Sequence, residues 1–382
     1  MNSPPREIAG VRGLRSQLRE HFFRVMRHVA QIEDTRQILS RQLDRQNLLR
    51  PPPEVRRLRG EVLPYPELGR AEIPRTAPDR VVPIFITGRF RSGSTLMWNL
   101  FRHLPATTAY YEPLNERRWF DRSLRGAKVD ATHRGVSDYW SEYEGLEELG
   151  EYFMEEWKFE HLYMPGHAWN PRMQRYIEIL IDHARGRAVL QFNEIDFRLP
   201  WIRAKFPQVK LLHIYRHPRD QWCSTLRSAA QTAARCSVRE FEPFDGFYLL
   251  RWGRDLAHYF PLLRLDAGAP AYELFYQLWR LSYLFGRCHA DLSVRFEDLV
   301  ASPREVIPET LATLDIHDYD LDRLTGIVSP TPAGKWKECA DEAWFAGIEA
   351  RVDADITAYS HCSGFPAVST SARIGLKAGR RG

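Results

Sequence analysis

Residues 81–101 read VVPIFITGRFRSGSTLMWNLF, and this stretch decides the fold of the chain. An apolar, β-branched run ends at Thr87, the loop 88–95 follows, and a helical pattern with Leu96 and Leu100 comes next. A strand that passes through a glycine-containing turn into a helix leaves unpaired backbone N–H groups at the helix N-terminus, where the helix dipole favours negative charge. The stretch therefore predicts an anion-binding loop.

The loop almost matches the phosphate-binding loop of ATPases, GxxxxGK[ST]. Gly88, Gly93 and Thr95 fit that pattern, but Ser94 stands where the lysine belongs, and the cation is Arg91, three positions earlier. Without the lysine, the loop is a poor site for a β/γ-phosphate with Mg²⁺. It can still hold a single 5′-phosphate-like group.

Composition limits the classes of protein that are possible. The chain has 382 residues, enough for one large α/β domain or two smaller ones, and a net charge of +5 from 54 basic and 49 acidic residues. This mild excess suits an anionic ligand better than a nucleic acid, which needs clustered charge. The short arginine cluster at 56–59 is better explained as part of a solvated linker, so we expect no nucleic-acid partner.

The cysteines and the terminus indicate a cellular location. The five cysteines are an odd number without a CxxC pair, which favours reduced thiols in the cytoplasm. No stretch approaches the ~20 apolar residues that would span a bilayer, and residues 1–10 lack the apolar core of a signal peptide. No histidine or cysteine cluster has metal-ligand spacing, so we expect no metal. The sequence thus predicts a soluble cytoplasmic protein.

The chain before residue 81 falls into two parts. Residues 1–50 contain an amphipathic helix at 11–50, whose apolar positions recur at spacings of three, four or seven: Leu18, Phe22, Val25, Val29, Ile32, Leu39 and Leu43. This helix either docks on the main domain or pairs with a second copy as a homodimer. Three prolines end it, and the Pro- and Arg-rich segment 51–80 is predicted to be a linker.

Strand and helix patterns alternate from residue 81 to residue 363, which predicts one α/β domain with a three-layer parallel sheet. Strands are expected at 81–87, 109–116, 188–195, 209–215 and 292–296, with a long helical section at about 219–290 that is broken near Pro243 and Gly268. Residues 120–187 are rich in charged and aromatic residues and are expected to be a mostly helical insert. The segment 364–382 has too few apolar residues to pack and is expected to be disordered.

A second candidate anion site lies in VKLLHIYRHPRDQWCSTLRS, residues 209–228. A buried strand ends at Arg216, Pro218 turns the chain, and a helix that contains Ser224 follows. A guanidinium group at a strand end offers a bidentate fork to phosphate oxygens, and a helix hydroxyl can add a donor.

RSGST after a strand, the His-Leu-Pro turn and YEPLNE resemble sulfotransferases that use 3′-phosphoadenosine 5′-phosphosulfate (PAPS). The chain is more similar to their carbohydrate and bacterial branches than to the phenol and steroid branch, whose loop carries lysine in place of Arg91. The resemblance implies a P-loop-like sulfotransferase fold in which Arg216 and Ser224 hold the 3′-phosphate of PAPS. It also assigns to cofactor binding the loop residues Arg89, Arg91, Ser92, Gly93, Ser94 and Thr95.

Two later segments extend the resemblance. RFEDL at 295–299 is similar to a strand end of the family in which Phe296 would line the adenine pocket, although phenylalanine lacks the usual tyrosine hydroxyl. GKWK at 334–337 resembles a basic loop that closes over the nucleotide through Lys335 and Trp336. Core packing for Phe296 and a plain surface loop for 334–337 are the alternatives.

Sulfuryl transfer needs a base for the acceptor hydroxyl and a cation for the leaving phosphate. Arg91 is the expected cation. Glu112, close to where glycan-modifying relatives have a catalytic glutamate, is the preferred base, before Glu194 and then Glu116. The aromatic insert would cap the acceptor side and favours a carbohydrate hydroxyl. The rivals are a P-loop nucleotide kinase or ATPase and a catalytically silent nucleotide-binding scaffold.

Overall fold

The computed structural model describes residues 81–363 except 126–128, 131–132, 134, 227–233, 264–265 and 332–333, together with 21–22, 24–26, 28–29, 32 and 35. The chain divides into two units, Met1–Pro78 and Asp79–Gly382. In the first unit, residues 21–22, 24–26 and 28–29 are helical, as expected for part of 11–50. The rest of that helix, the linker 51–80 and the tail 364–382 lie outside the described residues.

A parallel sheet of five strands forms the centre of the second unit within its described residues. The strands are β1 (Ile84–Thr87), β2 (Thr107–Tyr111), β3 (Arg187–Phe192), β4 (Lys210–Tyr215) and β5 (Leu292–Arg295), in the spatial order β2-β3-β1-β4-β5. All five expected strands are therefore present. The central strand β1 is buried along its whole length, which explains its uninterrupted apolar sequence.

The strand order brings the ends of three adjacent strands, and the candidate site residues that follow them, to the same edge of the sheet. Thr87 at the end of β1 is level with Phe192 of β3 and His213 of β4, so the three strands end at the same edge of the sheet. The chain leaves β1 toward β2 on one side, while β4 leads to β5 on the other. Ligands of open α/β sheets bind at such a switch point, outside the carboxyl ends of the strands.

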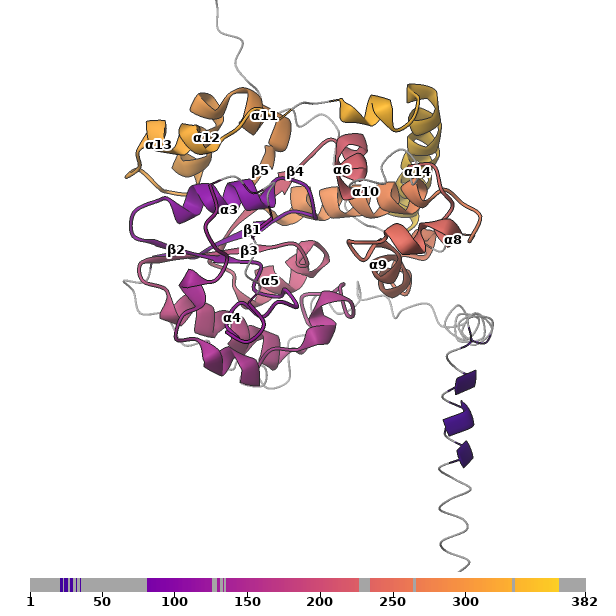
Figure 1. Ribbon diagram of the computed structural model, residues 1–382, viewed down its shortest axis with the longest axis horizontal. Coiled ribbons are helices and arrows are strands. Elements are labelled where there is room, and N and C mark those ends of the chain that lie inside the picture. The colour runs from indigo at the N-terminus through magenta and orange to yellow at the C-terminus, as the bar shows by residue number, and fades with distance from the viewer. Residues whose placement is uncertain are drawn as a thin grey trace, which may run out of the picture. The chain divides into compact units, whose positions relative to one another are not determined.

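Helices cover both faces of the sheet. In Figure 1, α3 (Ser94–Arg102), α12 (Pro303–Thr313) and α13 (Leu321–Ile327) lie on one side of it, and α4 (Pro171–His183) and α5 (Leu199–Lys205) on the other. The other named α-helices among the described residues 81–363 are α6 (Pro218–Thr225), α8 (Val238–Phe241), α9 (Leu249–Leu256), α10 (Ala271–His289), α11 (Phe296–Ala301) and α14 (Glu342–Ser363). No helix in the described part of the chain is long and apolar enough to cross a membrane.

The insert 120–187 differs from its expected mostly helical structure. Before α4, its described residues form only short 3₁₀ turns, η2 (Ser141–Tyr143), η3 (Glu147–Glu151) and η4 (Glu155–Lys158). The reason is aromatic packing: Phe120, Phe153, Trp157 and Tyr176 form a cluster with ring centroids 5.6 to 6.3 Å apart. This cluster buries the apolar surface of the insert without a helical period.

The turn from β1 into α3 requires glycine at two positions. A Cβ on Gly88 would lie 2.7 Å from the carbonyl oxygen of Ile214, and Gly93 has φ +96° with its Cα facing the ring of Phe296. The left-handed conformation disfavours a side chain at Gly93, and a Cβ there would also overlap the Phe296 ring. The glycines of the loop are thus needed for close packing as well as for the turn.

Gly93→Ala is expected to lower the melting temperature more than Gly145→Ala. Gly145 has φ +82° and nothing within 4 Å of the position that an alanine methyl group would take, so alanine there adds only backbone strain of about 1 kcal/mol. At Gly93 the overlap with Phe296 adds about 1–3 kcal/mol. Thermal melting of both variants tests this, and equal losses would show that the ring of Phe296 yields without cost.

Candidate active site

The two strand-to-helix corners contact each other. Nε of Arg91 donates a hydrogen bond of 3.0 Å to Oγ of Ser224, and Nη1 of Arg216 donates one of 3.3 Å to the backbone carbonyl of Arg91. The amide of Gln221 adds a bond of 2.7 Å to the carbonyl of Phe90. Side chains predicted from two segments about 125 residues apart in the sequence therefore lie in one site.

Arg216 has the surroundings of an anion-binding group. Its guanidinium carbon lies 4.9 Å from the centre of the Phe296 ring, and its Nε has no hydrogen-bond partner among the described residues. Burial lowers the pKa of Arg216, while Asp220 and Glu297 act in the opposite direction. A guanidinium group that rests on a ring with an unused N–H can still donate to phosphate oxygens.

Phe296 packs between the loop and Arg216. Its side chain is buried, with Gly93 on one side and the guanidinium group of Arg216 against its face. These contacts belong to a packed residue beneath the loop. The role of Phe296 as a wall of an adenine pocket stays a prediction.

The hydroxyl groups of the loop meet neighbouring strands at the N-terminus of α3. Ser94 Oγ donates 3.0 Å to Oδ1 of Asn193, and Thr95 Oγ1 lies 3.1 Å from the hydroxyl of Tyr111. Ser92 Oγ is buried and has no partner among the described residues, and α3 begins without a side-chain cap. The first amides of α3 are thus available to an anion.

Arg89 is held in a different environment from the rest of the loop. Its Nη1 donates 3.4 Å to the buried carboxylate of Asp196, and its guanidinium carbon lies 5.0 Å from the Trp252 ring centre. Burial lowers the pKa of Arg89, although Asp196 opposes this. The contacts are those of an internal ion pair that anchors the start of the loop, and they give no support to cofactor binding by Arg89.

Glu112 is connected to the loop through the side chain of Asn193. Its two carboxylate oxygens accept hydrogen bonds from the amides of Asn115 and Asn193, and Asn193 also accepts from Ser94. Burial raises the pKa of Glu112, while Lys158 and the amide donors lower it. Glu112 also has φ +40°, a strained conformation that ends β2 at Tyr111, so the strand is shorter than the expected 109–116.

Glu194 and Glu116 differ from Glu112 in exposure and partners. Glu194 is fully buried; one of its oxygens accepts 3.1 Å from the backbone N–H of Asn193, and Oε1 has no partner among the described residues. Burial and the neighbouring Glu112 raise the pKa of Glu194 to about 7. Glu116 forms an ion pair with Lys158 and accepts 3.0 Å from the hydroxyl of Tyr248. Among the described residues, Glu112 forms no ion pair with Arg89 or Arg91.

Asn193 and Lys158 are site residues that sequence reasoning missed. Asn193 directly precedes Glu194 at the end of β3, and this position after a strand is the signal that could have found it. Lys158 is the only lysine between Lys128 and Lys205 and is surrounded by glutamates in EEWKFE. Such a run is usually solvated, so the sequence gives no sign that Lys158 is buried.

The segment around Lys335 and Trp336 reaches the second corner. The carboxylate of Asp220 accepts bonds of 2.9 and 3.3 Å from the backbone N–H groups of Gly334 and Trp336, which begin the turn η9 (Lys335–Glu338). The Trp336 ring is parallel to His217, with centroids 6.4 Å apart, and the guanidinium carbon of Arg219 lies 4.6 Å from it. This segment is therefore fixed at the N-terminus of α6.

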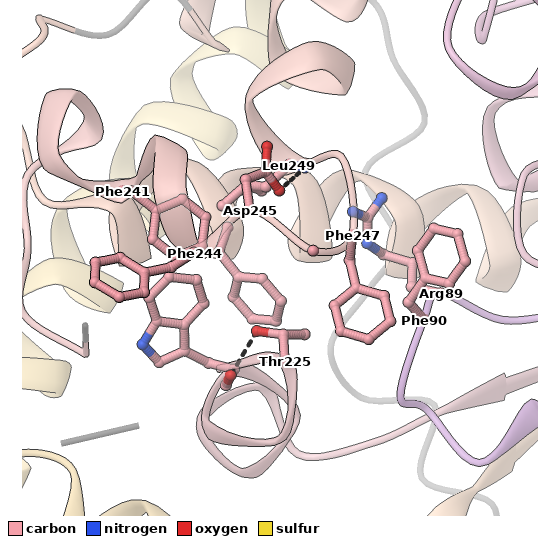
Figure 2. A pocket seen from close by; sticks show the side chains of 11 residues that line it. Arg89, Phe90, Thr225, Phe241, Phe244, Asp245, Phe247 and Leu249 are labelled. Atoms are coloured by element: carbon pink, nitrogen blue, oxygen red, sulfur yellow. Dashed lines mark hydrogen bonds between the residues drawn. The ribbon is translucent and has the colours of Figure 1, made fainter. Parts of the chain in front are cut away.

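A cavity next to the loop is lined mainly by aromatic rings, including Phe90, Phe244 and Phe247 (Figure 2). Its polar neighbours are already paired, since Asp245 accepts from the N–H groups of Leu249 and Leu250 at 2.7 and 3.0 Å. The cavity measures about 20 Å³, which is room for roughly one water molecule. A space of this size is too small to hold an acceptor molecule.

A model of the sulfotransferase family matches residues 83–320, which is more than half of the chain. No curated protein matches. No group of three or more His, Cys, Asp or Glu residues that could hold a metal is found in the part of the chain that the structure describes.

Solved structures similar to this chain include other sulfotransferases. The sulfotransferase domain of the Synechococcus PCC 7002 olefin synthase is 20% identical, with 73% of this chain and 97% of that chain covered and a TM-score of 0.35. STF9 from Mycobacterium avium is 14% identical, covering 75% and 77%, with a TM-score of 0.40. Mouse SULT7A1 complexed with PAP is 12% identical, covering 74% and 90%, with a TM-score of 0.35. On the match to the family model, the chain belongs to the sulfotransferase family.

Proposed function

We propose that this sulfotransferase transfers the sulfuryl group of PAPS to an acceptor hydroxyl, with Glu112 as the base. The observation that carries the proposal is the contact between the two corners, in which Arg91 donates to Ser224 and Arg216 donates to the carbonyl of Arg91. One bisphosphate nucleotide can then contact both corners at once. A loop that bound a single isolated phosphate would not need the second corner.

In the proposed complex, Arg216 and Ser224 bind the 3′-phosphate, and the first amides of α3 with Ser92, Gly93, Ser94 and Thr95 bind the 5′-phosphosulfate. Lys335 and Trp336 cover the nucleotide from the N-terminus of α6, where Asp220 fixes their segment. The acceptor oxygen attacks sulfur while the bond from sulfur to the bridging phosphate oxygen breaks. The proton of the hydroxyl goes to Glu112, and Arg91 neutralises the charge that develops on the leaving phosphate.

Glu112 is preferred to the other carboxylates because of its position. It is linked to Ser94 of the loop through Asn193, and it retains slight exposure of 7%, whereas Glu194 has none. Glu116 is already paired with Lys158. A base must reach the acceptor proton within hydrogen-bond distance, which a fully enclosed carboxylate does not do directly.

The acceptor is proposed to be a carbohydrate hydroxyl. Most rings of the insert, such as Tyr143 and Trp157, are buried in the aromatic cluster and cannot stack on a sugar, so this part of the proposal depends on the exposed Trp169 and on the resemblance of the loop to glycan enzymes. Screening sugars, lipids and aryl alcohols by mass spectrometry for the gain of one sulfate tests it. The cytoplasmic location and the homodimer through residues 11–50 stay predictions.

Arg216→Ala is expected to weaken binding of adenosine 3′,5′-bisphosphate by about ten- to a hundredfold, because a charge-assisted hydrogen bond to phosphate is lost. Isothermal titration calorimetry measures this. Arg304→Ala is the matched control, since Arg304 is 65% exposed and pairs only with the exposed Asp322 among the described residues. Equal affinity of the Arg216 and Arg304 variants would contradict the assigned 3′-phosphate site.

The same titration separates the proposal from its rivals. Adenosine 3′,5′-bisphosphate should bind more tightly than ATP with Mg²⁺. The reverse order would indicate a nucleotide kinase or ATPase. Binding of the bisphosphate without transfer of labelled sulfate to any acceptor would favour the catalytically silent scaffold.

A further inference from the structure

Lys158 is a buried cation next to the carboxylates of the site. Its side chain is 3% exposed, pairs with Glu116, and lies with its ammonium nitrogen 4.6 Å from the centre of the Tyr248 ring. The hydroxyl of the same tyrosine donates to Glu116. A lysine is almost never buried unless it is paired, so this residue has a specific electrostatic environment.

The backbone around Lys158 is fixed by two buried side chains. Nε1 of Trp252 donates 2.9 Å to the carbonyl of Lys158, and Nη2 of Arg198 donates 2.6 Å to the carbonyl of Trp157. Nη1 of Arg198 also donates 3.0 Å to the carbonyl of Glu194. Arg198 therefore joins the turn that carries Lys158 directly to the backbone of Glu194, just after the end of β3.

The site would contain an excess of buried negative charge without this lysine. Glu112 and Glu194 are both buried and adjacent to Asn193, and Glu194 Oε1 has no hydrogen-bond partner among the described residues. Two ionised carboxylates in such a place repel each other and are poorly solvated. The guanidinium group of Arg198 is occupied by backbone carbonyls, whereas the ammonium group of Lys158 pairs with the carboxylate of Glu116. Lys158 also acts electrostatically on both Glu112 and Glu194.

We propose that Lys158 is a positioning residue of the active site, whose buried ammonium group balances Glu112 and Glu194 and so sets the pH range in which Glu112 accepts the proton of the acceptor. The proposal rests on the proposed function for its link to catalysis. Its electrostatic part, the balance of charge among the three side chains, does not depend on which reaction the site performs.

Several groups face the carboxylates, and each of them raises or lowers the carboxylate pKa values in a known direction. Lys158 lowers the pKa of both Glu112 and Glu194, while burial raises the pKa of both. The two carboxylates in turn raise the pKa of Lys158, which burial lowers. Other charged or titratable side chains that interact with this group include Tyr111, Glu116, Tyr139, Tyr143, Arg198 and Tyr248. Removal of Lys158 therefore leaves the carboxylates protonated up to a higher pH.

Lys158→Met keeps the apolar stem and removes the charge. We expect the acid limb of its kcat/KM profile to move up by about 1 pH unit or more, because a nearby opposite charge is lost. Activity should return toward the wild-type value at high pH. Lys158→Arg, which keeps the charge, should return the acid limb of the profile to its wild-type position. A uniform loss at all pH values, with no displacement of the limb, would overturn the role in setting the pH range.

Thermal melting tests the charge balance without any assay of activity. Carboxyl groups whose pKa is raised on folding stabilise the fold at low pH and lose this contribution as the pH rises from about 4.5 through about 7. Lys158→Met should steepen that loss, so its melting temperature should fall relative to wild type by about 3 °C more at pH 8 than at pH 5.

A double variant separates the possible outcomes. Lys158→Met with Glu194→Gln removes both charges and should recover most of the deficit at pH 8. A deficit that is the same at pH 5 and pH 8 would mean that Lys158 contributes only packing, and the proposal would fail. If the melting results hold but no acceptor is sulfated under any condition, the charge balance stands and the proposed function is the part that fails.

Discussion

Replacing Arg91 by alanine should lower kcat by about 100- to 1000-fold, because a donor aimed at a developing anion contributes roughly 2.7–4 kcal/mol to the transition state. The guanidinium group lies at the junction of both corners through its bond to Ser224. A guanidinium group acts by charge and hydrogen bonding, without transfer of a proton. Steady-state transfer from labelled PAPS to the best acceptor of the screen measures the loss.

Two further variants define what the Arg91 result means. Arg91→Lys should recover part of the activity, since it keeps the charge but loses the planar fork. Arg122→Ala is a matched control, because Arg122 is 67% exposed and pairs with Glu144 and Glu147 on the surface of the insert. An Arg91→Ala enzyme within about threefold of the control would remove Arg91 from the mechanism, given the factor expected above.

Glu112→Gln should reduce kcat by about 100- to 10,000-fold, the usual contribution of a positioned general base. Glutamine can keep the hydrogen bonds to Asn115 and Asn193 in part but cannot accept the proton of the acceptor. Affinity for adenosine 3′,5′-bisphosphate should change little, because Glu112 lies at the end of β2, beyond Ser94 and Asn193. Rate and calorimetric measurements on the same preparation check both statements.

Glu194→Gln is the comparison that can reverse the assignment. Glu194 is fully buried beside Glu112, so its amide variant should change the pH dependence of turnover more than its maximum. If Glu112→Gln were fully active and Glu194→Gln inactive, Glu194 would be the base. Glu116→Gln should leave the maximum rate nearly intact, since Glu116 is engaged by Lys158 and Tyr248.

The five strands and both corners could be predicted because their sequence patterns are local. The apolar run that starts at Val81 contains the buried strand β1, Ile84–Thr87, and the glycines of the following loop need special backbone geometry. Arg216 and Ser224 flank a proline that begins a helix, which the structure shows as α6. In each case the signal is contained within one short segment of the chain.

The remaining features depend on contacts between distant segments. Arg89 lies in the same loop as Arg91, only two positions earlier, so the sequence does not distinguish them. In the structure, Arg89 forms an internal ion pair with Asp196 and its guanidinium group lies over the ring of Trp252. Lys158 lies buried in a turn whose backbone carbonyls accept hydrogen bonds from Trp252 and Arg198, which are distant in the sequence. The insert is not mostly helical, and its charge and aromatic content could not show this, because they do not distinguish a helix from a packed irregular segment.

The hydrogen bonds between Asp220 and residues 334–336 determine where a shorter recombinant fragment can end. The family match stops at residue 320. Asp220 accepts hydrogen bonds from the backbone N–H groups of Gly334 and Trp336, which lie beyond it. Arg219 also donates two hydrogen bonds to Glu349 of α14. A fragment cut at the limit of the match would keep both corner arginines but lose the partners of α6. Expression boundaries should therefore include α14.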